Sequence, residues 1–206
     1  MRHRVLLVSA LAGALSITAS ATAQADGPVT QTTTDSVMVD WTTTGELAGT
    51  TGNLHIGFLS LSDQPTGDVV EGFEFDYQCP AAFVPTTAGR DAVAEAETAG
   101  CEWLGDRYVE GGEVSVHVRP GLTAARVTGT VNDVRGISIP VDLRVTAIAP
   151  KTYDVQRDIL PGEYRRFTRT TSREAAVAGS IGQLDIADTA VASADINRVR
   201  YTAFEH

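Results

Sequence analysis

The stretch ISIPVDLRVTA, residues 137–147, decides the fold class of this chain. Its apolar residues occupy every second position, and Ser, Pro, Asp, Arg and Thr stand between them. A strand turns successive side chains to opposite faces, whereas a helix would scatter these apolar residues around its circumference. The stretch therefore predicts a strand with one buried face, and Pro140, which cannot donate a hydrogen bond, predicts an edge or a bulge.

The same two-residue period recurs along the chain on both sides of this stretch. Strands are predicted at 37–42, 54–61, 73–77, 114–119, 125–131, 163–171, 175–181 and 186–201. Turn signals such as Pro120-Gly121 separate them, and residues 150–161 are predicted to be a connection. Almost no helical segment is available to link parallel strands. The sequence therefore favours an all-β fold, an antiparallel β-sandwich or barrel-like domain.

Two cysteines, Cys79 and Cys101, are the only ones in the chain. An even number of cysteines in an exported protein predicts a disulfide, and two cysteines allow one intramolecular pairing. The fold class includes one short helix or loop between them, with a helix predicted over 90–98 and Gly100 at its end. Redox chemistry is disfavoured because the spacing is far from C-x-x-C.

The first 25 residues predict export. Arg2 and Arg4 precede the apolar run 5–15, and Ala-x-Ala sites end at Ala23 and Ala25. This order is typical of a cleavable signal peptide, and the run is shorter than the roughly 20 residues of a spanning helix. We therefore expect a signal peptide at 1–25, a flexible segment at 26–36 and a single β-rich domain at 37–206. The expected product is secreted and extracellular, with no stable membrane insertion after cleavage.

The charge balance limits the class of partner. The chain has 16 Lys and Arg against 26 Asp and Glu, and removal of the leader also removes Arg2 and Arg4. An acidic surface repels nucleic acid and anionic membranes, so neither is expected as a partner. An Ala-rich leader before a Thr-, Gly- and Val-rich acidic domain is similar to exported proteins of high-GC Gram-positive bacteria. That resemblance is one of composition and carries no site residues.

No catalytic residue, cofactor or metal site is predicted, because no motif for one is present. The sequence lacks G-x-S-x-G, H-E-x-x-H and a P-loop. One catalytic alternative stays open. Glu74 and Asp76 lie two positions apart on a predicted strand, roughly 6.5–7 Å apart on one face. Together with His55 they would suit a secreted hydrolase with a carboxylate-based site.

A run of basic and aromatic residues is the candidate binding surface. It consists of Tyr164, Arg165, Arg166, Phe167 and Arg169. Arg and Tyr are favoured at interfaces, although charge on a strand can also serve to protect a sheet edge. We expect a noncatalytic binding protein whose partner is a protein, a glycan or an anionic wall polymer. A secreted enzyme inhibitor presenting residues 80–100 is a further alternative.

Overall fold

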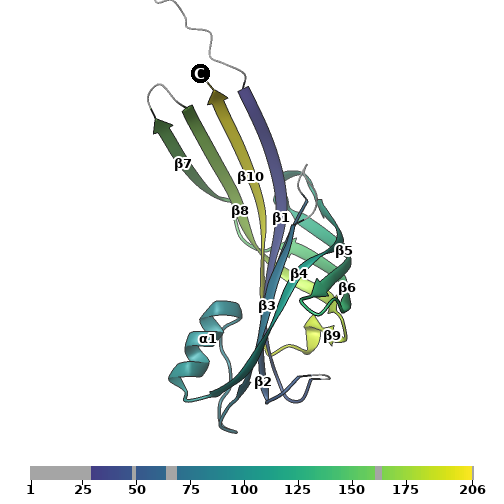
Figure 1. Cartoon of the computed structure of the whole chain (residues 1–206). Helices are drawn as coiled ribbons and strands as arrows, with labels where there is room; N and C mark the ends of the chain where they lie inside the picture. The colour runs from purple at the N-terminus through teal and green to yellow at the C-terminus, as the bar shows by residue number, and fades with distance from the viewer. Residues whose placement is uncertain (1–28, 48–49, 64–68, 161–163, 206) are drawn as a thin grey trace, which may run out of the picture.

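The computed structural model describes residues 29–47, 50–63, 69–160 and 164–205, which form antiparallel β-structure with one α-helix (Figure 1). The strands are β1 (Val29–Thr44), β2 (Leu54–Asp63), β3 (Val69–Gln78), β4 (Glu102–Val118), β5 (Ala124–Asp133), β6 (Ser138–Ala147), β7 (Thr152–Leu160), β8 (Tyr164–Ile181), β9 (Leu184–Asp185) and β10 (Val191–Glu205). The helix is α1 (Gly89–Thr98), and short 3-10 turns lie at η1 (Pro120–Leu122) and η2 (Ile186–Asp188). The all-β, antiparallel fold class is confirmed.

The strand pairs close on themselves in a barrel-like circuit, called the barrel below. β1 pairs with β2, and each strand up to β6 pairs with the next. β6 then pairs with β8, β8 with β10, and β10 returns to β1. Val37, Val39, Leu59, Leu61, Val127, Leu143 and Ile196 fill its interior.

The stretch 137–147 shows why the barrel forms. From Ser138 it becomes β6, whose inward residues Val141, Leu143 and Val145 are all buried, while Asp142 and Arg144 are exposed. Burial of such side chains contributes about 1.5–3 kcal/mol each, which makes the alternating face the main stabilising feature. The period-2 prediction is confirmed here.

Beyond the barrel, β1, β8 and β10 continue and are joined by β7 in an extended sheet, called the arm below and seen at the top of Figure 1. It consists of residues 29–36, 152–160, 164–172 and 197–205. β8 belongs to both regions: its first half lies between β7 and β10, and from Ala175 onward it pairs with β6. β1 and β10 likewise run unbroken from the barrel into the arm.

The arm corrects three expectations. From Val29 onward the segment predicted as flexible is part of β1, because β10 hydrogen-bonds along it as far as the Val29–Phe204 pair. Its β-branched threonines suit a strand. The connection predicted at 150–161 contains β7, and the predicted strands 163–171 and 175–181 are one strand, β8. The predicted signal peptide, 1–25, lies outside the described residues.

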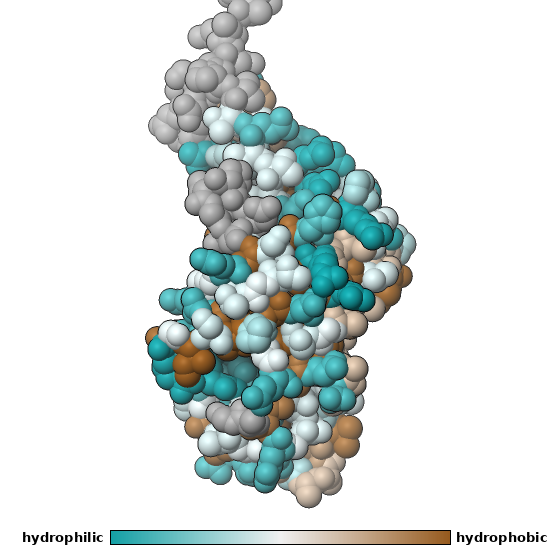
Figure 2. Space-filling view, turned by 90° about the vertical axis from the view of Figure 1, so that its right-hand side faces the viewer, coloured by the Kyte–Doolittle hydropathy of each residue, from teal (hydrophilic) through white to brown (hydrophobic). Residues whose placement is uncertain are grey.

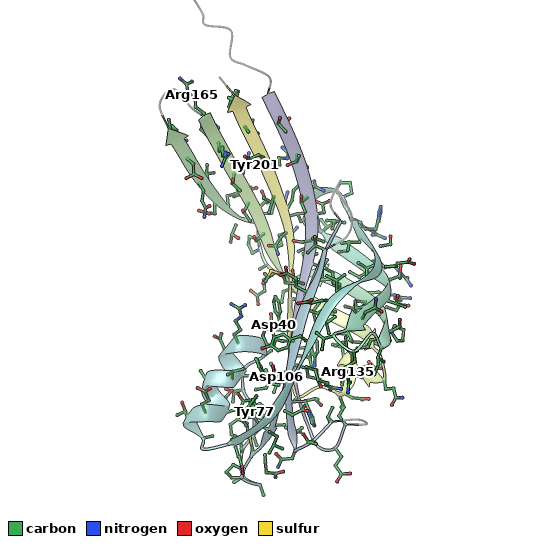
Figure 3. All side chains as sticks on the ribbon, viewed as in Figure 1. Asp40, Tyr77, Asp106, Arg135, Arg165 and Tyr201 are labelled. Atoms are coloured by element: carbon green, nitrogen blue, oxygen red, sulfur yellow. A yellow bond between two sulfur atoms is a disulfide. The ribbon has the colours of Figure 1, made fainter. Side chains whose placement is uncertain are left out.

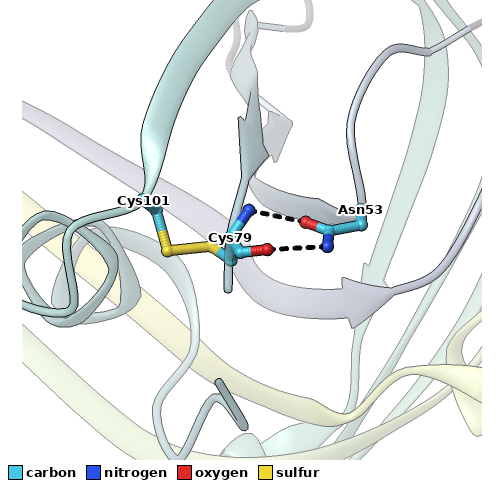
Figure 4. Close-up of a disulfide and its surroundings, with 3 residues drawn as sticks. All are labelled: Asn53, Cys79 and Cys101. Atoms are coloured by element: carbon cyan, nitrogen blue, oxygen red, sulfur yellow. Dashed lines mark hydrogen bonds between the residues drawn. A yellow bond between two sulfur atoms is a disulfide. The ribbon is translucent and has the colours of Figure 1, made fainter. Parts of the chain in front are cut away.

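The predicted disulfide between Cys79 and Cys101 is present and brackets α1 (Figure 4). Asn53 fixes the backbone of Cys79 on both sides: Cys79 N donates to Asn53 Oδ1 at 2.7 Å, and Asn53 Nδ2 donates to Cys79 O at 3.0 Å. α1 packs on the outer surface of the barrel through Ala92 and Ala96. In the described part of the chain, no helix is long and apolar enough to span a membrane.

Candidate functional site

The strand register of the arm gathers arginines on one side of it. Directly opposite residues of antiparallel strands share a face. Arg169 lies opposite Arg200, Arg157 opposite Phe167, and Arg165 opposite Phe204. We call this side the basic face; it carries Arg157, Arg165, Arg169, Arg198 and Arg200 together with Tyr153, Val155, Ile159, Phe167 and Phe204, and Arg173 follows on the same side where the arm meets the barrel.

Three of the five predicted binding residues belong to the basic face. Arg165 and Arg169 are exposed on it, and Arg165 stands at the tip of the arm in Figure 3. Phe167 lies between them and packs edge-on against Phe204 with ring centroids 5.9 Å apart. Arg166 extends from the opposite face of β8, and Tyr164 begins that strand. The candidate segment is therefore split between two faces rather than forming one surface.

Neighbouring groups hold several of the arginines in place. Arg198 donates two hydrogen bonds to the carboxylate of Asp35, at 2.6 and 2.7 Å, and these raise the pKa of its guanidinium. Arg173 Nε donates to the carbonyl of Ala149 at 2.9 Å. The guanidinium of Arg169 lies 5.1 Å from the ring centre of Tyr153, within range of a cation–π interaction. The face is thus partly preorganised.

The positive charge of the basic face is largely uncompensated. On the described residues of the four arm strands, Asp35 is the only carboxylate of this face, and it is engaged by Arg198. Asp63 of β2 is the strand neighbour of Asp35 at the junction with the barrel. Arg169 and Arg200 are exposed and stand opposite one another, with Thr33 beyond Arg200 on β1. Like charges placed directly opposite each other destabilise a sheet. Stability of the fold therefore does not explain this arrangement.

A small cavity lies where the basic face meets the barrel. Its volume is about 180 Å³, and four cations surround it: Lys151, Arg169, Arg198 and Arg200. The turn at η1 closes one side through Leu122. An oxygen-bearing anionic group of carboxylate size would meet charge-assisted donors there, which are roughly twice as strong as neutral ones.

The residues of the catalytic alternative meet inside the barrel. His55, Glu74 and Asp76 offer atoms that all lie within 4.8 Å of one another, and Glu74 and Asp76 share the inner face as predicted. Burial is the main cause that raises the pKa of Glu74, and the Arg107 charge opposes it. His55 is fully buried.

The ring nitrogens of His55 are both engaged. Nδ1 lies 2.7 Å from Asp76 Oδ1, and Nε2 lies 3.0 Å from the carbonyl oxygen of Gly45. The second oxygen of Asp76 accepts a long bond from the backbone of Thr51. A general base or a metal ligand needs a free ring nitrogen. The His55–Asp76 pair therefore has the geometry of a structural contact that ties Gly45 and Thr51 to β2 and β3.

Sequence reasoning missed the arginines supplied by other strands, among them Arg157, Arg198 and Arg200. The alternation of Tyr153, Val155 and Ile159 was the available signal for β7. No protein-family model matches this chain and no curated protein is similar to it in sequence, so its function is inferred from its own residues.

Proposed function

We propose that this protein is an exported, noncatalytic binding protein and that the basic face of its arm binds an acidic protein partner. The observation that carries the proposal is the pair of exposed arginines, Arg169 and Arg200, set opposite one another without a carboxylate between them. Their mutual repulsion is relieved when an anion lies between them. The net acidic composition of the whole chain makes this concentration of arginines more distinctive.

The apolar side chains on the same face favour a protein over a charged polymer. Tyr153, Val155 and Ile159 are each more than half exposed, and they alternate along β7 on the side that carries the arginines. Protein interfaces combine aromatic and aliphatic anchors with Arg. A simple polyanion would use the guanidinium groups and leave these apolar side chains in water.

The free edge of β7 supports the same partner class. Its described hydrogen-bonded neighbour is β8 alone, so its other edge is open to an added strand. An extended acidic segment pairing there would gain main-chain hydrogen bonds and place its carboxylates over the basic face. Every described side chain of β7 is exposed, as expected of an edge strand to which a partner strand can be added.

Export is part of the proposal and has two supports. The leader at 1–25 has the order of a signal peptide, and the Cys79–Cys101 bond is typical of oxidising compartments. The intact mass of the protein from culture medium tests this step. A mass that matches a chain beginning directly after Ala23 or Ala25 supports export. Recovery of the uncleaved chain from the cytoplasm contradicts export.

The binding test compares two polymers of known chemistry. The acidic copolypeptide poly(Glu,Tyr) stands for a protein partner, and polygalacturonate stands for a charged glycan. In calorimetric titration we expect the disulfide-bonded protein to bind poly(Glu,Tyr) at least tenfold more tightly than it binds polygalacturonate. The affinity for poly(Glu,Tyr) should fall as the salt concentration rises.

Variants of equal charge locate the binding. Arg169→Thr/Arg200→Thr is expected to weaken poly(Glu,Tyr) binding at least tenfold, about 1.4 kcal/mol. Arg144→Thr/Arg166→Thr removes the same amount of positive charge from other faces of the molecule. We expect this double variant to change the affinity for poly(Glu,Tyr) less than twofold. Equal losses in both double variants would contradict a site on the basic face. Tighter binding of polygalacturonate than of poly(Glu,Tyr) would contradict a protein partner and indicate a glycan partner instead.

A further inference from the structure

One row of residues crosses four neighbouring strands on the inner side of the barrel. Trp41 of β1 lies opposite Gly57 of β2, Gly57 opposite Glu74 of β3, and Glu74 opposite Arg107 of β4. Neighbouring strands lie about 4.8 Å apart, so the row brings an indole, a carboxylate and a guanidinium together inside the barrel. We call these three side chains the polar row.

Gly57 provides the space for the indole. A Cβ atom on Gly57 would overlap Cε2 and Cζ2 of Trp41 and would lie 2.6 Å from Nε1. The ring therefore lies across the second strand of the row, toward the strand that carries Glu74. Residue 57 is therefore a glycine because the indole occupies the space of a side chain, and not because the backbone there needs extra flexibility.

The polar row contains two buried donors without a hydrogen-bond partner, Trp41 Nε1 and Arg107 Nε. The acceptor Glu74 Oε1 lies in the same row and is ion-paired to Arg107 Nη2 at 2.7 Å. Each such donor costs about 1–3 kcal/mol when it stays unpaired. Two of them in one row, beside a carboxylate, indicate a place for a ligand.

The polar row forms part of the lining of a cavity of about 450 Å³ at the end of the barrel away from the arm. The remaining lining is mostly apolar: Leu47, Leu59, Val109, Val131, Ile139, Ile181 and Leu184. Figure 2 shows the molecule from the side, with polar side chains above, on the arm, and apolar ones reaching the surface lower down. Cavities of about 300–1,000 Å³ with a few convergent polar groups are typical of small-molecule sites.

We propose that this cavity binds a small apolar molecule with a single hydroxyl head group, an aliphatic alcohol or a phenol. The hydroxyl oxygen accepts from Trp41 Nε1 and Arg107 Nε, and its hydrogen is donated to Glu74 Oε1. One hydroxyl group can make all three bonds, whereas an ether or ketone has no hydrogen to donate to Glu74. A carboxylate head group would be repelled by the charge of Glu74, and an ammonium head group would be repelled by the charge of Arg107.

The proposal is independent of the basic face, which lies at the other end of the molecule. The probe is 1-octanol, and the readout is the indole N–H resonance of Trp41 in the ¹⁵N-labelled, disulfide-bonded protein. The chain has two tryptophans, and Trp103 is exposed, so its resonance is an internal control. We expect a saturable shift of the Trp41 resonance and none of the Trp103 resonance.

Two comparisons test the hydrogen bonds separately from hydrophobic binding. The ether 1-methoxyheptane has the same number of non-hydrogen atoms as 1-octanol and no donor. We expect it to bind at least tenfold more weakly. Trp41→Phe keeps an aromatic ring and removes the N–H, and we expect a tenfold loss of 1-octanol affinity by calorimetry. Glu74→Gln keeps the shape and changes the acceptor, which gives a second variant if Trp41→Phe does not fold.

The proposal fails if the Trp41 resonance does not move up to the solubility limit of 1-octanol. It also fails if the ether binds as tightly as the alcohol, because the cavity would then be an apolar space without a head-group site. Binding of poly(Glu,Tyr) to the basic face is unaffected by either result.

Discussion

β1, β8 and β10 run through both the barrel and the arm, yet the same face of these three strands is apolar in the barrel and basic in the arm. Along β10 the inward positions change from Ala194 and Ile196 to Arg198 and Arg200. Along β1 they change from Val37 to Asp35. The change falls where the circuit of strands ends. Burial by neighbouring strands, rather than strand propensity, therefore decides the composition of the face.

The two regions also differ in the sign of the charges that they concentrate. On the outer surface of the barrel, Asp40 is partly buried near Asp195, and burial followed by the Asp195 charge raises the pKa of Asp40 to about 6. Burial and then the charge of Glu174 raise the pKa of Asp195 as well. Both regions thus hold unfavourable like-charge groups, acidic on the barrel and basic on the arm.

The largest expected difference between the barrel and the arm is in how much a truncated side chain lowers the free energy of unfolding. Leu143→Ala in the barrel removes a fully buried side chain, and we expect it to lower the free energy of unfolding by about 3 kcal/mol. Val155→Ala in the arm truncates a half-exposed side chain and is expected to cost less than about 0.5 kcal/mol. Urea denaturation measures both. Similar losses would mean that the arm is as tightly packed as the barrel.

A smaller and pH-dependent effect is expected for Asp40→Asn. The pKa of Asp40 is raised in the folded protein, so its ionisation destabilises the fold as pH rises from about 4 to about 6. The variant should be more stable than the wild type at pH 7.5 by about 1 kcal/mol, a value reduced for partial exposure. The two proteins should have equal stability below pH 4.

Asp154→Asn is the control for this measurement, since that side chain is exposed on β7. It should change stability little at either pH. A stability gain of Asp40→Asn that is the same at pH 4 and pH 7.5 would show that the carboxylate charge is not its cause.

The smallest expected effect is on the arm itself. Arg200→Thr removes one of two opposed arginines and places a β-branched residue in the strand, so stability should rise by about 0.3 kcal/mol. Thermal unfolding at low and high salt measures this gain, which should shrink as salt screens the repulsion. A loss of stability would mean that Arg200 supports the fold and would weaken its assignment to a partner.

The difference between the regions also explains what the sequence could predict. The barrel strands were predictable because burial on one face imposes alternation, as in 137–147. The arm lacks that constraint, so 29–36 and β7 resembled loops in their Thr, Asp and Arg content. The strand state of 29–36 depends on β10, more than 100 residues away, as the Val29–Phe204 pair shows. β7 pairs with the nearby β8, and every described side chain of β7 is exposed, so no buried face marks it in the sequence.

The candidate sites follow the same rule. Spacing alone placed Glu74 and Asp76 on one face. The addition of Arg200 to the basic face, and of Trp41 and Arg107 to the polar row, depends on the register between strands. Register follows from the closed circuit as a whole and has no local signal in the sequence.

β8 runs from the tip of the arm into the barrel without interruption, over 18 residues. At about 3.3 Å per residue the strand is at most roughly 55 Å long. A partner at the arm tip and a ligand in the cavity, both proposed above, would therefore bind at opposite ends of one continuous strand. Under these two proposals the protein would act as a spacer between two bound molecules.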